Sequence, residues 1–349
     1  MSQDYEERKP LHIYAIKNKD ENVRLQSSSG GLFSVLAENI INEDGVVYGA
    51  SFDKQWNVRH CSITSKEDIS KLRGSKYVQS DIGYIFQDIR KRLKGNTKVM
   101  FSGTPCQVAG LKHFLGKEEK NLTTLDFVCH GVPNPRIWRD YLDEEMQNYK
   151  TTRCTKQDSS TNQSNLSIKD ISFRNKMDGW KKFRFVINVA ESKSYGESRI
   201  VTSTPHWDNL YMKLFLENYI LRPCCYSCKF RKGKSGADYT MGDYWGVQNA
   251  AYGFDDDKGV SLLMKYVNDT ELNSLITKHC DVIDTTYESA INGNPAIIKD
   301  WPQNRLSSLF YFFHDVLSLN IRNSWLICHK MKTILSNFTR LFDLIPYHK

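Results

Sequence analysis

The stretch that decides the fold runs from residue 98 to residue 135 and reads KVMFSGTPCQVAGLKHFLGKEEKNLTTLDFVCHGVPNP. Its apolar runs predict two short strands, over Lys98–Phe101 and Leu125–Cys129, each followed by turn-forming residues. A helix is expected from about Gln107 to Leu115. Asn134-Pro135 is typical of a second helix start, because Asn caps helices and Pro fits their first turn. This strand–helix–strand–helix order predicts parallel strands in an α/β arrangement.

The segments on either side extend this prediction. Upstream, the Ser/Gly loop Ser27–Gly31 precedes apolar residues at helical spacing over Leu32–Ile41, and Val46–Phe52 is expected to be a strand. Downstream, Phe183–Val189 alternates like a strand, and a helix is expected over Trp207–Tyr219. We therefore expect an α/β fold whose mixed or mostly parallel sheet is flanked by helices, with a smaller α+β C-terminal part and a helical tail.

Composition shifts suggest four parts of the chain. An α/β core is predicted over residues 1–150, and the polar stretch 151–166 is the best candidate for a linker or loop. Residues 167–300 are predicted to form a cysteine-containing α+β part that completes the binding sites of the core. Residues 301–349 form a helical tail.

The composition excludes several classes of protein. The 349 residues are 40% hydrophobic and 25% charged, as in ordinary globular proteins. The N-terminus, MSQDYEERKP, is not a signal peptide, and no stretch approaches the roughly 18 apolar residues of a membrane span. A cytoplasmic location is therefore expected. Disulfides are rare there, so nine cysteines indicate metal ligands, catalytic groups or buried thiols.

The formal net charge of +8 suits an anionic partner. The sequence carries no zinc-finger, helix-turn-helix or RNA-binding fingerprint, so no nucleic-acid partner is expected. An acidic electron-carrier protein, a phosphate-bearing cofactor and a merely solvated basic surface all remain compatible with this charge.

Four cysteines have a pattern that suits a metal site. Cys225 and Cys228 form a Cys-x-x-Cys pair, which zinc, iron–sulfur clusters and dithiol redox pairs all use. Cys106 and Cys129 each follow a predicted strand, and parallel neighbours would bring both thiols to one sheet edge. Together the four suit a [4Fe–4S] cluster or zinc. Buried structural cysteines are the open alternative, since free Cys is among the most buried residue types.

Two segments are candidates for binding phosphate. The Ser27–Gly31 loop opens a helix whose free N–H groups favour an anion, although such a loop is also an ordinary helix cap. Residues Arg73–Ser80, RGSKYVQS, combine cations, hydroxyls, an amide and an aromatic ring, which suits a flavin nucleotide; a solvated loop is the alternative. There is no G-x-G-x-x-G and no P-loop, so a standard dinucleotide or NTPase site is disfavoured.

Five segments in this order resemble a known family. They are SGGLFS (29–34), GSKYVQS (74–80), FSGTPCQVAGL (101–111), CHGVP (129–133), and RPCCYSC (222–228) followed by DYTMGDYWG (238–246). The chain resembles the beta subunit of coenzyme F420 hydrogenase and its dehydrogenase relatives, from about residue 25 to 250.

The resemblance implies an FAD-dependent iron–sulfur oxidoreductase. Electrons would pass between a [4Fe–4S] cluster and the flavin, then to a deazaflavin such as coenzyme F420 or another small-molecule acceptor. The implied cluster ligands are Cys106, Cys129, Cys225 and Cys228. The implied flavin contacts are Ser28, Ser29, Gly30, Gly31, Phe33, Ser75, Lys76, Tyr77, Gln79 and Ser80. No acid or base is assigned; His130, beside Cys129, is a candidate, and so is a purely structural histidine there.

The chain departs from the family pattern in one respect. Many relatives carry an N-terminal ferredoxin-like module, whereas the first cysteine here is Cys61. Electrons are therefore expected from a separate ferredoxin-like carrier or another redox subunit. Two alternatives stay open: a zinc-stabilised, non-catalytic scaffold, and an accessory redox protein of surface-polysaccharide biosynthesis, which the resemblance also allows.

Overall fold

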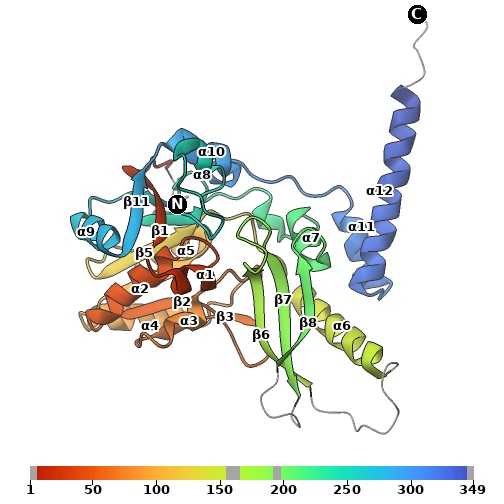
Figure 1. Cartoon of the computed structure of the whole chain (residues 1–349), viewed down its shortest axis with the longest axis horizontal. Helices are drawn as coiled ribbons and strands as arrows, with labels where there is room; N and C mark the ends of the chain where they lie inside the picture. The colour runs from red at the N-terminus through yellow and green to blue at the C-terminus, as the bar shows by residue number, and fades with distance from the viewer. Residues whose placement is uncertain (1–5, 155–165, 192–197, 344–349) are drawn as a thin grey trace, which may run out of the picture.

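The computed structural model describes residues 6–154, 166–191 and 198–343. An eight-stranded mixed sheet forms its centre, with the strand order β11-β1-β10-β9-β5-β4-β2-β3 (Figure 1). The strands are β1 (His12–Asn18), β2 (Val46–Phe52), β3 (Val58–Ile63), β4 (Val99–Gly103), β5 (Leu122–Phe127), β9 (Tyr239–Asp243), β10 (Ser261–Lys265) and β11 (Cys280–Asp284).

The middle of this sheet is parallel and its edges are antiparallel. Strands β2, β4, β5 and β9 run parallel to one another. Each outer strand is antiparallel to its inner neighbour: β3 to β2 at one edge, and β10 to β9, β1 to β10 and β11 to β1 at the other. Strands β4 and β5 are the parallel neighbours that the sequence predicted, with Gly103 opposite Asp126. The expected mixed α/β architecture is thus confirmed, and the segments after β4 and β5 leave the sheet at the same edge.

Both faces of the sheet are covered, which explains why its central strands are apolar throughout. In β4, Val99 and Phe101 pack with helices α4 and α5, whereas Met100 packs with α2 and α3 on the opposite face. These helices are α2 (Leu32–Asn42), α3 (Ile69–Leu72), α4 (Ile85–Lys94) and α5 (Pro105–Leu115).

Shorter helices complete the two layers. Leu272 and Ile276 of α9 join the α2 side of the core, and Val247 of α8 and Ala290 of α10 cover the opposite face of β1 and β10. The remaining helices of this part are α1 (Glu21–Gln26), α8 (Val247–Ala250), α9 (Thr270–His279), α10 (Tyr287–Gly293), and the 3-10 turns η1 (Pro223–Cys225) and η2 (Pro295–Ile297).

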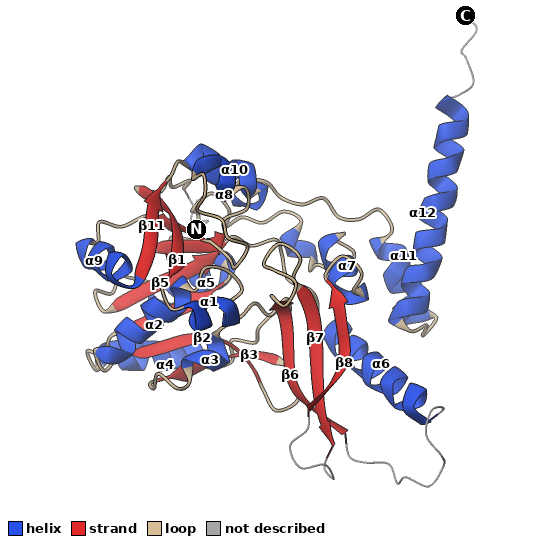
Figure 2. Cartoon of the chain, viewed as in Figure 1, coloured by secondary structure: helices blue, strands red, loops and turns tan. Residues whose placement is uncertain are grey.

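A separate three-stranded antiparallel sheet packs beside the main one (Figure 2). Its core is strongly aromatic, with Trp138, Phe173, Phe185 and Tyr211 all fully buried and in ring contact. Its elements are β6 (Leu166–Asn175), β7 (Arg184–Glu191), β8 (Ser198–Pro205), α6 (Pro135–Cys154) and α7 (Leu210–Leu216).

The predicted division of the chain meets one correction. The polar stretch 151–166 does not begin as a linker, because α6 continues to Cys154. Thr151 and Thr152 donate their hydroxyls to the carbonyls four residues back, so their polar groups are satisfied within the helix. Residues 155–165 lie outside the described residues. The parts before and after them both contribute strands to the eight-stranded sheet, and the domain boundary itself stays a prediction.

The C-terminal segment is helical. It comprises α11 (Ser307–Tyr311), the π-helical turn η3 (Phe312–Val316) and α12 (Ile321–Asp343), and α12 extends away from the body of the molecule in Figure 1. Of the helices within the described residues, none combines the length and the apolar character that crossing a membrane requires.

Candidate functional site

Cys106 lies at the start of α5, directly after β4. Thr104 and Gln107 form a capping box, and Pro105 occupies the first turn, so the local sequence fixes the place where the helix begins. The Thr104 hydroxyl lies 3.1 Å from the Cys106 sulfur. Although Cys106 reaches the surface, loss of hydration raises the pKa of its thiol, and the nearby Cys228 and Cys224 thiols raise it further.

Cys129 follows β5 at the same edge of the sheet. The chain leaves the strand through Val128, whose N–H donates to the carbonyl of Met241 at 2.7 Å. Burial raises the pKa of the Cys129 thiol well above its ordinary value, and the charges of Cys106 and Cys225 act in the same direction. The parallel pairing of β4 with β5 therefore brings together two thiols that the sequence placed after separate strands.

Cys225 and Cys228 reach this edge on a loop that packs against the segment after Cys129. Arg222 N–H donates to the carbonyl of Val132 at 3.0 Å, and Pro133 forms an isolated bridge with Leu221. Gly131 has a φ of +144°, and a Cβ atom there would lie 3.2 Å from the Cβ of Cys225. Burial raises the pKa of Cys225 to about 11, with Cys224 and Cys106 contributing.

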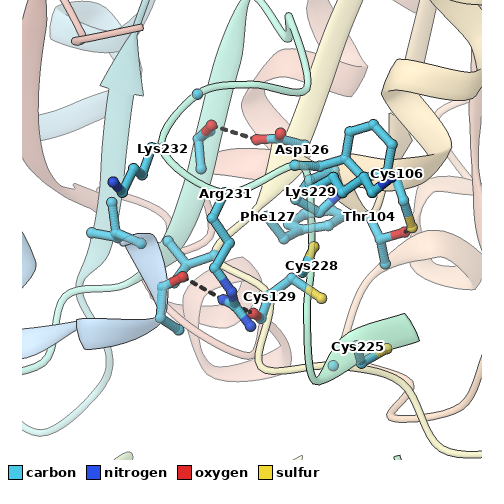
Figure 3. Close-up of a pocket in the computed structure, with 18 of the residues that line it drawn as sticks. Thr104, Cys106, Asp126, Phe127, Cys129, Cys225, Cys228, Lys229, Arg231 and Lys232 are labelled. Atoms are coloured by element: carbon cyan, nitrogen blue, oxygen red, sulfur yellow. Dashed lines mark hydrogen bonds between the residues drawn. The ribbon is translucent and has the colours of Figure 1, made fainter. Parts of the chain in front are cut away.

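The four predicted cysteines line one pocket of about 260 Å³, which we call the cysteine pocket (Figure 3). Cys224 lines it as a fifth thiol, and Asp126, Thr240 and Tyr266 also line it. Within the described part of the chain, no three Cys, His, Asp or Glu side chains stand close enough to surround a single metal ion. The thiols thus share a cavity without being closed around one point.

Asp126 is a buried carboxyl that the sequence did not single out. It accepts hydrogen bonds from the hydroxyls of Ser235 and Thr240 and is 2% exposed. Burial raises its pKa to about 7, and the two hydroxyl donors limit that rise.

His130 does not line the cysteine pocket. Its Nε2 lies 2.8 Å from Asn218 Oδ1, and its ring packs against Phe215 and Trp301. Burial lowers the pKa of His130, which favours the neutral ring. A role for His130 in proton transfer stays a prediction.

The Ser/Gly loop before α2 uses its own polar groups. Gly30 N–H donates to Ser261 Oγ, Gly30 C=O accepts from Asn18 N–H, and a Cβ at Gly30 would lie 2.2 Å from the Ile16 carbonyl. Gly31, with a φ of +84°, caps α2, and Ser29 donates to the carbonyl of Val260. Close packing on β1 and β10 therefore explains the two glycines without a ligand.

The second candidate flavin segment, Arg73–Ser80, contacts the segments that carry the cysteines. Gln79 N–H donates to the carbonyl of Pro133 at 3.2 Å, and Arg222 of the cysteine loop donates to the Gln79 side chain. Gln107, next to Cys106, donates to the carbonyl of Ser80 at 3.2 Å. None of the ten predicted flavin contacts lines the cysteine pocket, but Gln79 and Ser80 touch the segments that carry the cysteines.

The other members of that segment are packed or capped. Lys76 Nζ donates to the carbonyls of Arg73 and Gly74 at the end of α3, and burial lowers its pKa to about 8. Tyr77 stacks on Phe215 with 4.8 Å between ring centroids. Phe33, in the first turn of α2, is partly buried against the core.

The buried Arg174 organises a group of half-buried residues that we call the Arg174 network, formed by Ser28, Ser75, Tyr77, Arg174 and Asp243. The guanidinium pairs with the Asp243 carboxylate at 2.7 Å and also donates to the Tyr77 hydroxyl at 3.1 Å. It donates to the carbonyl of Ser28 at 3.3 Å, and Ser28 Oγ accepts from Ser75 N–H at 2.6 Å. Arg174 Nε is buried without a hydrogen-bond partner.

The network gives Asp243 and Trp245 roles that the sequence motif did not reveal. Asp243 also accepts from Trp180 Nε1 at 3.0 Å, and Trp245 stacks on Trp180 with centroids 4.5 Å apart. Both residues therefore hold the turn after β6 against the main sheet. Sequence reasoning missed Arg174 because it lies in an ordinary strand pattern, with no motif around it.

Two family models match most of the chain. The family model for the C terminus of the coenzyme F420 hydrogenase/dehydrogenase beta subunit matches residues 96–285, more than half of the chain, and the corresponding N-terminal model matches residues 13–86. A chain in a xenon-derivatised structure of the F420-reducing [NiFe] hydrogenase complex from Methanosarcina barkeri is similar at 16% identity and a TM-score of 0.49, covering 85% of this chain and 91% of that one. No curated protein sequence matches the chain.

Proposed function

Because the chain belongs to the coenzyme F420 hydrogenase/dehydrogenase beta-subunit family, which implies redox electron transfer, we propose that it is a flavin- and iron–sulfur-dependent oxidoreductase. The observation that carries the proposal is the adjacency of the two candidate sites. Segments bearing Cys106 and Cys129 contact Ser80 and Gln79 directly. A thiolate-bound cluster and a flavin at these places would be close neighbours.

The donor set of the cysteine pocket fits a cluster. The four proposed ligands face one cavity, together with Cys224, and burial raises the pKa of Cys106, Cys129 and Cys225, so thiolates are costly there without a compensating cation. Bound iron would supply that positive charge and favour the thiolate form of the cysteines that hold it. A cluster also spans more space than one zinc ion, whose four sulfurs would lie about 2.3 Å from the metal. We assign Cys106, Cys129, Cys225 and Cys228 as ligands.

The Arg174 network fits an anionic group of a flavin nucleotide. The unpaired Nε of Arg174 is a buried donor, and such donors are normally satisfied. Ser28, Ser75 and Tyr77, three of the predicted flavin contacts, lie within this network. When bound, the flavin would accept one or two electrons, which links single-electron supply to hydride chemistry. The protein residues would hold the phosphate and ring of this cofactor in place.

The loop that carries Cys225 and Cys228 is also basic. Lys229, Arg231, Lys232 and Lys234 follow within six residues of Cys228, and the first three line the cysteine pocket. Positive charge around the entrance of an electron-transfer site favours docking of an acidic carrier. We propose a ferredoxin-like partner here, with coenzyme F420 or another small molecule as the final acceptor.

Anaerobic reconstitution followed by reduction tests this function. The wild-type protein is given iron, sulfide and FAD, desalted, and mixed with reduced ferredoxin in the absence of oxygen. The proposal predicts a flavin spectrum above broad cluster absorption, followed by bleaching of the flavin band. Lys229→Glu should slow the bleaching and weaken its dependence on salt. A protein that takes up neither flavin nor iron would show that the fold serves a different task.

A further inference from the structure

Arg231 occupies an unusual position at the cysteine pocket. Its side chain is only 8% exposed, although it belongs to a surface loop. The guanidinium donates from Nη1 to the carbonyls of Cys129, at 2.8 Å, and Ala296, and from Nη2 to the carbonyl of His130 at 3.4 Å. In Figure 3 Arg231 lies beside Cys129, on the wall of the pocket.

Asp300 extends these contacts to a second cysteine. Its Oδ1 accepts from Arg231 Nε at 2.6 Å and from the N–H of Cys228 at 3.2 Å. The Arg231–Asp300 pair therefore joins the backbones of Cys129 and Cys228, which come from two segments far apart in sequence. A planar guanidinium suits this task, because its fixed fork of donors holds several acceptors at once.

The two charges of the pair are not equally screened. The Asp300 side chain is 41% exposed, so water weakens its field, whereas Arg231 is almost completely enclosed. The positive charge of Arg231 consequently dominates on this wall of the pocket, beside Cys129. A net positive field favours any state of the pocket that carries additional negative charge.

From this geometry we propose that Arg231 is a positioning residue that holds Cys129 and Cys228 in place and raises the reduction potential of a cluster bound in the cysteine pocket. The inference rests on the proposed function and adds to it a residue that tunes the site. Reduction adds one electron from a mediator and breaks no bond, so the effect of Arg231 is electrostatic and structural. Surrounding charges and hydrogen bonds are established means of setting such potentials.

Potentiometric titration of the reconstituted protein, with small-molecule mediators in place of the partner, measures the effect. Arg231→Gln should lower the reduced-to-oxidised ratio at a given potential about tenfold, a shift of about 59 mV for a one-electron couple. Lys229→Gln removes one positive charge from the same loop at an exposed position and should shift the potential much less. Asp300→Asn keeps an acceptor for Cys228 N–H and should shift the potential in the opposite direction, upward.

Arg231→Lys separates position from charge. It should keep a near wild-type potential but lose iron to a chelator several-fold faster, because one ammonium cannot hold the acceptors that the guanidinium holds. In apoprotein, Arg231→Gln should also speed hydrogen–deuterium exchange over residues 223–231, a readout that needs no cluster.

The outcomes are distinguishable. Equal potentials for wild type, Arg231→Gln and Lys229→Gln, with wild-type iron retention in Arg231→Lys, would overturn the role of Arg231 and leave the proposed function standing. Wild-type protein that assembles no cluster would overturn both.

Discussion

The cysteine pocket and the Arg174 network lie on neighbouring segments, but they use their functional groups differently. The pocket presents thiols to an open cavity, and burial makes the ionised forms of Cys106, Cys129 and Cys225 costly. In the Arg174 network, Ser28, Tyr77 and Asp243 are already paired within the protein. The pocket would thus gain a full set of new bonds on binding metal, whereas the network has one unpaired donor to offer, Arg174 Nε, and would otherwise exchange bonds that it already makes. Substitutions in the two regions should therefore differ greatly in effect.

The largest effect is expected from Cys129→Ser. Cys129 lines the pocket as a proposed ligand, and a serine hydroxyl is a poor substitute for a thiolate toward iron. Iron content after anaerobic reconstitution should fall at least tenfold. Cys61→Ser, which changes a cysteine of β3 outside the pocket, is the matched control and should keep its iron. Full iron in Cys129→Ser would remove this residue from the ligand set.

Asp243→Asn should affect stability next most strongly. It leaves the buried guanidinium of Arg174 without its carboxylate, and breaking a buried pair typically costs about 3–5 kcal/mol. Urea denaturation measures the change in the free energy of unfolding. Asp178→Asn, in the more exposed pair with Arg184, should cost less than about 1 kcal/mol. Similar losses in both variants would mean that the Arg174 network is not a buried electrostatic centre.

Asp126 should make the free energy of unfolding depend on pH in a distinctive way. Its folded-state pKa of about 7 lies above the unfolded value, so the folded state binds the extra proton between these two values. Stability should accordingly fall as pH rises from about 4 to about 7, by about 2–4 kcal/mol relative to Asp126→Asn. Denaturation of both proteins across this range tests the sign. A difference that stays flat with pH would show that Asp126 titrates normally.

The smallest effect is expected from Ser28→Ala. Loss of this hydroxyl removes the acceptor for the N–H and hydroxyl of Ser75 and one candidate flavin contact. The dissociation constant for FAD should rise about tenfold, which corresponds to about 1.4 kcal/mol. Fluorescence titration provides the measurement, and Ser70→Ala on the exposed side of α3 should bind as tightly as wild type. Unchanged FAD affinity in Ser28→Ala would place the flavin elsewhere.

The sequence allowed the sheet edge to be predicted better than the residues that support it. Cys106 and Cys129 follow apolar strands, and parallel pairing alone brings such residues together. Arg174, Arg231 and Asp300 act through contacts between segments far apart in the chain, for which no local pattern exists. The same limitation applies to Gly30. Its Ser/Gly loop resembled a phosphate-binding loop, but a glycine is required there because a Cβ would clash with the Ile16 carbonyl of β1. Polar cross-links of this kind become visible only when the fold is known.

The central claim is that four cysteines from three separate segments hold one iron–sulfur cluster. Native mass spectrometry of the reconstituted protein, kept free of oxygen, tests it most directly. The account predicts a species heavier than the apoprotein by about four irons and four sulfides, as expected for a four-cysteine [4Fe–4S] site. A species carrying a single zinc ion, or apoprotein alone, would contradict it.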